Sequence, residues 1–328
     1  LKEAYKLDAF NHKTVNLLTL HDELPKRYVW HEVGKIKFLI PKDEVKLISR
    51  YVPQVLNRTV RTYIKKYRYT PHIPVYMELY DKAQDFQART FGEPAETGIM
   101  GVCFGKVVTS MSPSLGRTNW AYVLWHELAH VIHVQMTSGK VPRWFTEGLA
   151  EYETVVARPE WKREYSRDLY RMRATGTMPS VMVLNLRFTR SKTIRGIIMA
   201  YYQSTLIMEY LHKRWGWSKI VEALHAYSKG KDTRQVLREV FEIQPKAFDE
   251  AFSKHLDKRL SHYRGQFDPL SFMARDVKKY GKNLEKLMKG KSAGAGGTGA
   301  QGVQPGLSLP RLQAELLRTP RNALDEAT

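Results

Sequence analysis

Two histidines four residues apart, with a glutamate directly after the first, are the residues of this sequence best suited to chemistry. Residues i and i+4 of a helix lie one above the other on the same face, so His126 and His130 can direct two imidazole nitrogens at one metal ion. Glu127 lies about 100° further round the helix and would border the open side of the metal. A carboxylate there can take the proton of a zinc-bound water, whose pKa is about 7. The pattern therefore predicts a zinc site that activates water, with one ion per chain.

A third ligand is expected from the acidic residues that follow. Sixteen residues separate His130 from Glu147, which lies in the run Trp-Phe-Thr-Glu-Gly-Leu-Ala-Glu-Tyr at 144–152. Two histidines and one glutamate make a catalytic zinc set that leaves one position for water. Glu151 follows one turn later on the same face, and helical spacing alone allows either carboxylate to be the ligand. We favour Glu147, because a metal-bound histidine usually gives its other N–H to a carboxylate, and Glu151 is suited to that part.

These two segments resemble the gluzincin zinc metallopeptidases, the group that includes thermolysin and the zinc aminopeptidases. In that group a His-Glu-x-x-His helix is followed by a second helix that carries a Glu ligand. The run at 144–152 is most similar to that of bacterial peptidase MA-like domains. The resemblance implies that His126, His130 and Glu147 are the zinc ligands, that Glu127 is the general base, and that an acidic residue belongs at position 151. It is firm over 121–153 and weaker over 35–265.

The fold that the resemblance implies is α+β and thermolysin-like, with two lobes. A mixed-sheet N-terminal lobe would hold the metal helix, and the C-terminal lobe would be all helical. Local patterns agree, because 35–40 and 73–80 read as strands and 43–66 as an amphipathic helix with a kink or break at Pro53. The glycine-rich stretch 97–110 predicts two short strands or a bulged hairpin. In the family it resembles, a strand here forms the edge of the cleft and pairs with the substrate.

Helices are expected over most of the remaining chain. The metal helix should begin after an N-cap at Thr118 or Asn119 and continue through Met136, with His133 as a core or supporting residue. The other expected helices are 143–155, 160–173, 197–215, 218–227, 233–241 and 247–263.

Six segments are predicted from these patterns. An N-terminal arm at 1–34 precedes a mixed α/β lobe with the zinc site at 35–156 and a helical C-terminal lobe at 157–265. A basic helical extension follows at 266–291, then a flexible linker at 292–308, rich in glycine and alanine. The last segment, 309–328, reads as the start of a helical, repeat-like module.

Charge suggests an anionic partner. The 53 basic and 33 acidic residues give a formal net charge of +20, which attracts a membrane surface, a cell-wall polymer, an acidic protein or nucleic acid. A solvated basic surface without a specific partner is the alternative. No nucleic-acid-binding motif is present, so no specific nucleic-acid partner is expected. Between Asp168 and Glu209 the chain has basic but no acidic residues, which would favour acidic peptides or a carboxyl terminus if they face the cleft.

The compartment is not determined by the sequence. The single cysteine, Cys103, excludes an internal disulfide, and no run of 18 apolar residues predicts a membrane span. The resemblance implies a bacterial protein, cytoplasmic or extracytoplasmic. The chain begins at Leu1 without a basic and then apolar leader, so a targeting segment could be missing from it. The oligomeric state also stays open.

A further catalytic residue is expected in the C-terminal lobe. Gluzincins similar to this chain place a Tyr or His there, opposite the general base, as a hydrogen-bond donor to the oxyanion. We assign this role to Tyr201, because the Tyr-x-x-Ser spacing at 201–204 is similar to that of peptidase MA-like domains. Tyr202 points about 100° away and is expected in the core. Packing of both tyrosines in the core is the alternative.

The expected function is a zinc-dependent peptidase that acts on a peptide or protein substrate. An aminopeptidase needs acidic side chains that hold a free α-amino group. No short glycine-rich, glutamate-bearing stretch of that kind precedes the metal helix, which favours an endopeptidase. The alternative is a catalytically inactive gluzincin-like module that binds or scaffolds through its basic surface and C-terminal helices. The complete set of four core residues argues against that alternative.

Overall fold

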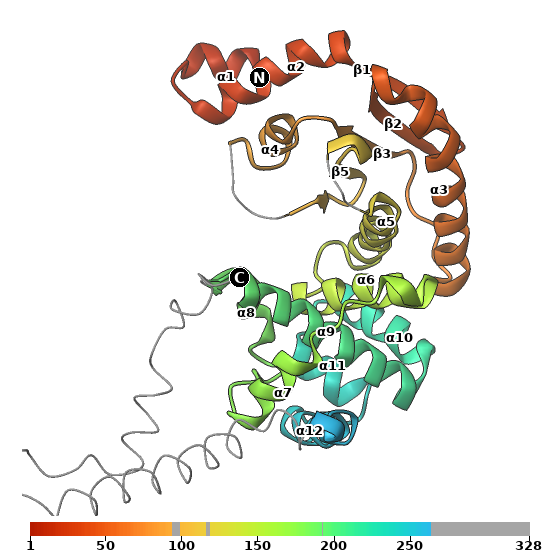
Figure 1. Cartoon of the computed structure of the whole chain (residues 1–328), viewed down its shortest axis with the longest axis vertical. Coiled ribbons are helices and arrows are strands. Elements are labelled where there is room, and N and C mark those ends of the chain that lie inside the picture. Colours follow the sequence, from red (N-terminus) through yellow and green to blue (C-terminus); the bar gives the residue numbers. More distant parts are fainter. Residues whose placement is uncertain (94–98, 116–118, 192, 264–328) are drawn as a thin grey trace, which may run out of the picture. The chain divides into compact units, whose positions relative to one another are not determined.

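Residues 1–93, 99–115, 119–191 and 193–263 are described by the computed structural model, and they belong to one compact unit, Leu1–Pro269. This part is an α+β structure, in which a mixed sheet with its helices adjoins a group of helices (Figure 1). The predicted extension at 266–291, linker at 292–308 and helical segment at 309–328 lie outside the described residues. The division of the chain at residues 34 and 156 stays a prediction.

Five strands form one sheet within the described residues, in the order β1-β2-β3-β5-β4. They are β1(Tyr28–Val33), β2(Ile36–Pro41), β3(Val75–Tyr80), β4(Gly101–Cys103) and β5(Val107–Met111). β2, β3 and β5 run parallel, and β1 and β4 pair antiparallel at the two edges. β2 and β3 are buried along nearly their whole length, as expected for central parallel strands. The pair of short strands expected in the glycine-rich stretch is present as β4 and β5.

β1 is the element that sequence patterns do not predict, because 1–34 reads as an arm of mixed character. The strand begins at Tyr28, directly after a helix that ends at Arg27, so no turn signal separates the two. Its residues alternate between more and less buried positions, as befits an edge strand with one open face. The sheet therefore gains a strand from the predicted arm.

Four helices accompany the sheet. They are α1(Lys2–Leu7), α2(His12–Arg27), α3(Val45–Tyr67) and α4(Ala83–Phe91). α3 is continuous through Pro53, so of the predicted kink or break the break does not occur. Its buried stripe includes Val52, Leu56, Tyr63 and Tyr67, and the helix packs against β2 and the next long helix, α5. α3 thereby braces the helix that carries the two histidines.

The two helices that carry the predicted metal ligands are α5(Trp120–Thr137) and α6(Arg143–Ala157). Asn119 caps α5 by accepting a hydrogen bond from the backbone N–H of Tyr122 at 3.1 Å, as predicted from the sequence. Left-handed backbone at Ser138 and Gly139 ends the helix. α5 contacts α3 and β4 as well as α6. Burial on most sides fixes the rotation of α5, and with it the direction of its histidines.

The remaining described helices are α7(Ser166–Ala174), α8(Leu184–Arg190), α9(Ile194–Trp215), α10(Trp217–Ser228), α11(Thr233–Glu239) and α12(Pro245–Arg259). Of these, α8 and α9 pack against α6, and the others precede or follow them in the chain. The helix predicted over 160–173 is shorter than expected. The Glu164 carboxylate accepts a hydrogen bond from the N–H of Ser166 at 3.0 Å, and α7 begins only there. None of the described helices is both long enough and apolar enough to cross a bilayer.

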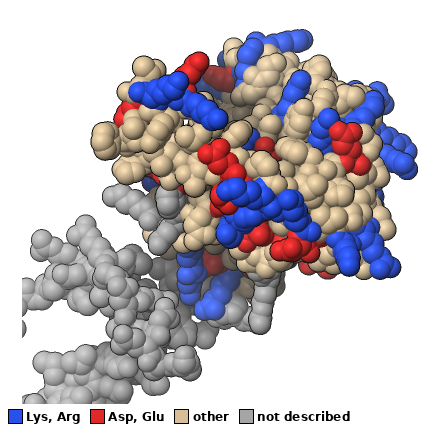
Figure 2. All heavy atoms as spheres, turned by 90° about the horizontal axis from the view of Figure 1, so that it is seen from above, with Lys and Arg blue, Asp and Glu red and all other residues tan. Residues whose placement is uncertain are grey.

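The net charge is distributed widely. On much of the face shown in Figure 2, acidic side chains lie next to basic ones. No single basic patch dominates that view.

Two helices approach each other closely at Gly148. A Cβ atom added to Gly148 in α6 would lie 2.6 Å from the carbonyl oxygen of Ser204 in α9. The absence of a side chain therefore lets the two backbones touch, and this contact sets how near α9 comes to the residues of α6.

We expect the substitution Gly148→Ala to lower the free energy of unfolding by about 1–3 kcal/mol, because the methyl group forces the two backbones apart. Thermal and urea unfolding followed by circular dichroism measure the change. Val156→Ala, at an exposed position of the same helix, is the control and should shift stability by less than about 0.5 kcal/mol. Equal stability of the Gly148→Ala and wild-type proteins would contradict this account of the contact.

Candidate metal centre

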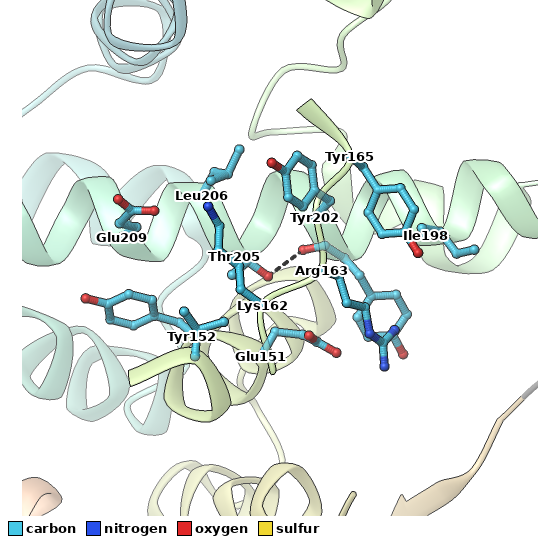
Figure 3. Close-up of a pocket in the computed structure, with 12 residues that line it drawn as sticks. Glu151, Tyr152, Lys162, Arg163, Tyr165, Ile198, Tyr202, Thr205, Leu206 and Glu209 are labelled. Atoms are coloured by element: carbon cyan, nitrogen blue, oxygen red, sulfur yellow. Dashed lines mark hydrogen bonds between the residues drawn. The ribbon is translucent and has the colours of Figure 1, made fainter. Parts of the chain in front are cut away.

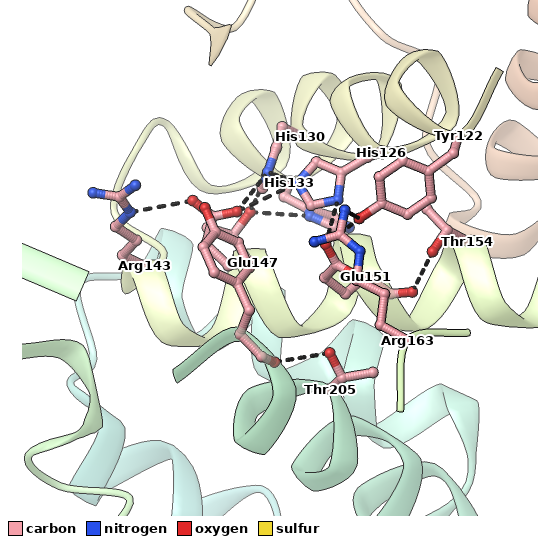
Figure 4. Close-up of polar contacts among 12 residues, drawn as sticks. Tyr122, His126, His130, His133, Arg143, Glu147, Glu151, Thr154, Arg163 and Thr205 are labelled. Atoms are coloured by element: carbon pink, nitrogen blue, oxygen red, sulfur yellow. Dashed lines mark hydrogen bonds and ion pairs between the residues drawn. The ribbon is translucent and has the colours of Figure 1, made fainter. Parts of the chain in front are cut away.

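Three potential ligand atoms from α5 and α6 converge on one point. Nε2 of His126 and Nε2 of His130 are 3.1 Å apart. Oε2 of Glu147 lies 3.4 Å from the first nitrogen and 3.2 Å from the second. Figure 4 shows the two imidazoles reaching from α5 toward this carboxylate on α6. All three side chains are buried, and they form the one group of this kind among the described residues.

These separations fit a small tetrahedral ion. Zinc binds nitrogen and carboxylate oxygen at about 2.0–2.1 Å, so two of its ligands at the tetrahedral angle are about 3.3–3.4 Å apart. The observed distances of 3.1, 3.2 and 3.4 Å lie close to that edge length. His126, His130 and Glu147 could therefore hold a metal ion through three positions and leave a fourth for water.

The second oxygen of Glu147 is held by Arg143, one turn earlier on α6. Nε of Arg143 donates to Oε1 at 3.1 Å, which leaves Oε2 for the histidines. Burial alone would raise the pKa of Glu147, but the imidazoles of His130 and His126 lower that pKa well below its usual range. Glu147 is thus a carboxylate, the form that binds a metal.

Glu151 lies behind His126. Its Oε1 is 3.6 Å from Nδ1 of His126, slightly beyond hydrogen-bond range, and Nδ1 has no other partner among the described residues. The same oxygen accepts a hydrogen bond from the hydroxyl of Tyr122, which accepts one from Arg163 at 2.8 Å. Glu151 is therefore fixed from the side away from the metal position.

A longer chain of hydrogen bonds stands behind His130. Nδ1 of His130 is 2.8 Å from the Thr146 hydroxyl, which is 3.1 Å from Nδ1 of His133. Nε2 of His133 is 2.8 Å from the hydroxyl of Tyr67, and that hydroxyl is 2.9 Å from Oε1 of Glu153. The chain thus connects α5 with α6 and α3. We call it the His130 relay.

The direction of the relay follows from its carboxylate end. Glu153 pairs with Lys66 at 2.6 Å and can only accept, so the single hydrogen of the Tyr67 hydroxyl points to Glu153. Burial raises the pKa of Glu153, and Lys66 opposes the rise. Burial also lowers the pKa of His133 far below its usual value, so its ring is neutral. With Tyr67 already used as a donor, His133 must donate from Nε2 and accept at Nδ1.

The rest of the relay is then determined. The Thr146 hydroxyl donates its one hydrogen to Nδ1 of His133, so it can only accept from His130. Nδ1 of His130 therefore carries a hydrogen, and Nε2 is the nitrogen that faces His126 and Glu147. A metal that binds at Nε2 requires this hydrogen on Nδ1.

Glu127 is buried beside this group, with its side chain against β4. A Cβ atom on Gly101 would lie 2.6 Å from Oε1 of Glu127, so the glycine makes room for the carboxylate. Oε2 has no hydrogen-bond partner among the described residues. Burial raises the pKa of Glu127 to about 8, Glu147 acts in the same direction, and His130 opposes the rise. A bound dication would lower this pKa again.

Tyr201 in α9 adjoins the group from the helical side. Burial raises the pKa of its phenol, the charge of Glu147 adds to the rise, and Arg143 opposes it. The phenol is thus a donor at neutral pH. Together with Glu151, Tyr201 lines a pocket between α6, α9 and the segment around Arg163 (Figure 3). The hydroxyl of Tyr202 instead bonds Ser166 at 2.8 Å and Glu164 at 2.7 Å.

The structure thus brings most of the sequence-predicted residues together. Glu147, and not Glu151, reaches the two Nε2 atoms. His133, expected as a core or supporting residue, is part of the His130 relay. Several supporting residues are absent from the sequence analysis, namely Tyr67, Tyr122, Arg143, Thr146, Glu153 and Arg163. Helical spacing could have suggested Tyr122 and Arg143, which lie four residues before His126 and Glu147.

A comparison with known protein families finds a match over the part of the chain that holds this group. Residues 60–258 match the sequence model of the peptidase MA superfamily. The match begins in the C-terminal half of α3 and ends in α12, so it includes α5, α6 and α9. No curated protein matches the chain.

We expect Thr146→Val to weaken Zn²⁺ binding by about 10- to 100-fold, because valine cannot connect His130 with His133. Thr146→Ser keeps the hydroxyl and should bind nearly as tightly as the wild type. Competition with a chromophoric chelator measures the affinity. The control is Thr154→Val, since that buried hydroxyl on the same helix bonds only the carbonyl of Glu151. If both valine variants bind Zn²⁺ like the wild type, the relay does not prepare His130.

Proposed function

The chain belongs to the peptidase MA superfamily, and we propose on that basis that it is a zinc-dependent peptidase with His126, His130 and Glu147 as its metal ligands. The observation that carries the proposal is the convergence of three buried ligand atoms at 3.1–3.4 Å. Zinc, when bound there, would lower the pKa of a water to about 7 and polarise the scissile carbonyl. Peptide or protein would be the substrate.

Glu127 is proposed as the general base. Its carboxylate takes a proton as the oxygen of water attacks the carbonyl carbon, and returns it to the nitrogen as the C–N bond breaks. Two observations support this role: Oε2 is a buried acceptor without a partner in the part of the chain that the structure describes, and the backbone of β4 leaves space for the side chain only because residue 101 is glycine. The base is therefore held close to the place where the peptide would lie.

Tyr201 is proposed as the donor to the oxyanion. Its neutral phenol lies on the opposite helix, α9, and is electrostatically coupled to both Glu147 and Glu127. A preorganised O–H that meets developing charge lowers the barrier without reorganisation. Tyr202 is less suited, because its hydroxyl is bonded to Ser166 and Glu164.

β4 offers a way to bind an extended peptide. It is the last strand of the sheet among the described residues, and its Gly101 contacts the proposed base. A substrate that adds to this edge would be held by main-chain hydrogen bonds, with little demand on sequence. Binding along a strand suits cleavage within a chain, so an endopeptidase is favoured. The layout would then be thermolysin-like, with the sheet and the helical group as its two lobes.

A catalytically inactive binding module is the second candidate. It would use the basic surface and leave the buried group without a role. The His130 relay argues against this candidate. A hydrogen-bond network that only stabilised the fold would not have to place the hydrogen of His130 on Nδ1, as metal binding at Nε2 requires.

We expect Glu127→Gln to keep full zinc content and lose peptidase activity, because an amide cannot take the proton while all three ligands remain. Elemental analysis gives the metal content, and digestion of a peptide library with and without a chelator gives the activity. Glu160→Gln, at an exposed site, is the matched control and should digest like the wild type. Full activity of the Glu127→Gln protein at normal zinc content would rule out this mechanism.

For Tyr201→Phe we expect kcat to fall by about 10- to 1000-fold with KM and zinc content nearly unchanged, as for the loss of one oxyanion donor. Tyr202→Phe removes a hydroxyl from the next position and is the control, with kcat near that of the wild type. Steady-state kinetics on the best peptide from the library separates the two. A loss confined to Tyr202→Phe would transfer the role to that residue.

A further inference from the structure

The stretch that contains α3 is rich in basic residues and has no acidic ones. Between Glu44 and Glu78 the chain has seven basic residues and no acidic one. Six of these seven lie in α3, Val45–Tyr67, which lies at the outer side of the sheet in Figure 1. α3 therefore carries several positive charges and no negative charge.

Five of these cations share one side of the helix. At about 100° per residue, their positions fall within an arc of about 120°. They span 19 residue steps, or about 29 Å at 1.5 Å each. All five side chains are exposed. We call this set the α3 cationic face; it consists of Lys46, Arg50, Arg58, Arg61 and Lys65.

No acidic side chain among the described residues pairs with the α3 cationic face. The neighbouring Lys66 shows the contrast, because it points inward and pairs with Glu153 at 2.6 Å. Arg50 lies 5.5 Å from the ring centre of Tyr51, a contact that leaves its charge uncompensated. The positive field of this face is therefore open to a partner.

Apolar groups stand at the N-terminal end of the same face. Leu47 and Tyr51 are 53% and 43% exposed. Beside them is an apolar hollow of about 260 Å³. Its lining residues are Leu47, Ile48, Tyr51, Val52, Pro113 and Trp120.

We propose that the α3 cationic face binds the surface of a membrane that contains anionic lipids, with Leu47 and Tyr51 among the headgroups. Basic residues attract such a surface additively, and an apolar contact supplies the second signal that stable attachment needs. A nucleic acid or an acidic protein would match the charges but would have no use for exposed apolar groups at one end. Charge and apolar exposure together therefore favour lipid.

The attachment would leave the metal centre intact. The opposite face of α3 holds Tyr63, which donates to the carbonyl of Trp125 at 2.9 Å, and Tyr67 of the relay. Binding at the outer face requires no movement of these groups. The protein would then act on peptides at a lipid surface, where its proposed substrates would be concentrated.

Cosedimentation of the full-length chain with lipid vesicles tests the proposal. The wild type should bind vesicles of equal parts phosphatidylglycerol and phosphatidylcholine, should not bind phosphatidylcholine alone, and should be released by salt as charges are screened. Arg50→Gln, Arg58→Gln, Arg61→Gln and Lys65→Gln combined should lower the partition coefficient about tenfold or more. Absence of wild-type binding to the anionic vesicles would overturn the proposal.

A matched variant distinguishes this face from bulk charge. In this variant four exposed basic residues of α11 and α12 are replaced, so its net charge changes by the same amount as that of the quadruple α3 variant. The substitutions are Arg234→Gln, Arg238→Gln, Lys246→Gln and Lys254→Gln. It should bind anionic vesicles like the wild type. Equal losses in the two variants would mean that overall charge, and not α3, drives binding. Unchanged thermal unfolding of both variants verifies that they are folded.

The apolar end is tested separately with Leu47→Asn combined with Tyr51→Asn. This variant keeps every cation and should bind vesicles several-fold more weakly, with its affinity for a DNA duplex unchanged. If it binds vesicles like the wild type, while the quadruple α3 variant loses affinity for the duplex, the face recognises nucleic acid and the proposal fails. None of these readouts depends on peptidase activity.

Discussion

The buried ion pair of Lys66 and Glu153 is the interaction on which the rest of the centre depends. A buried carboxylate is costly unless it is paired, and here the partner comes from another helix. Lys66 also lies 3.8 Å from the ring centre of Trp217 in α10, so the pair ties α3, α6 and α10 together. The negative charge of Glu153 gives every hydrogen bond between Glu153 and His130 one allowed direction. The position of the hydrogen on His130 is therefore set by a carboxylate that is separated from it by three side chains.

The two histidines are held from opposite sides by different means. His130 depends on a relay that involves α5, α6 and α3, whereas His126 has Glu151 close behind it, backed by Tyr122 and Arg163. In both cases the last residue is a glutamate of α6 with a basic side chain near it. Glu153 pairs with Lys66, and Glu151 is connected to Arg163 through the hydroxyl of Tyr122. α6 thus provides a ligand and both supports, and its contact with α9 through Gly148 adds the phenol of Tyr201 to the same space.

The convergence of His126, His130 and Glu147, the proposed metal ligands, could be predicted from the sequence because it is local: these residues lie on two consecutive helices, at spacings that helical geometry translates directly into direction. The resemblance to peptidase MA-like domains rested on the same residues and is confirmed by the family match. The relay could not be predicted, since Tyr67 and His133 are 66 positions apart and meet only through tertiary packing. β1 was missed for a local reason, because Arg27 and Tyr28 pass from helix to strand with no turn residue between them.

The contact between Gly101 and Glu127 limits how this chain can vary over evolution. Any side chain at 101 would meet Cγ and Cδ of Glu127 within 2.9 Å, and the glutamate, as the flexible partner, is the group that would yield. Under the proposed mechanism, Gly101 is therefore a position where a substitution would displace the general base, although residue 101 itself carries no functional group.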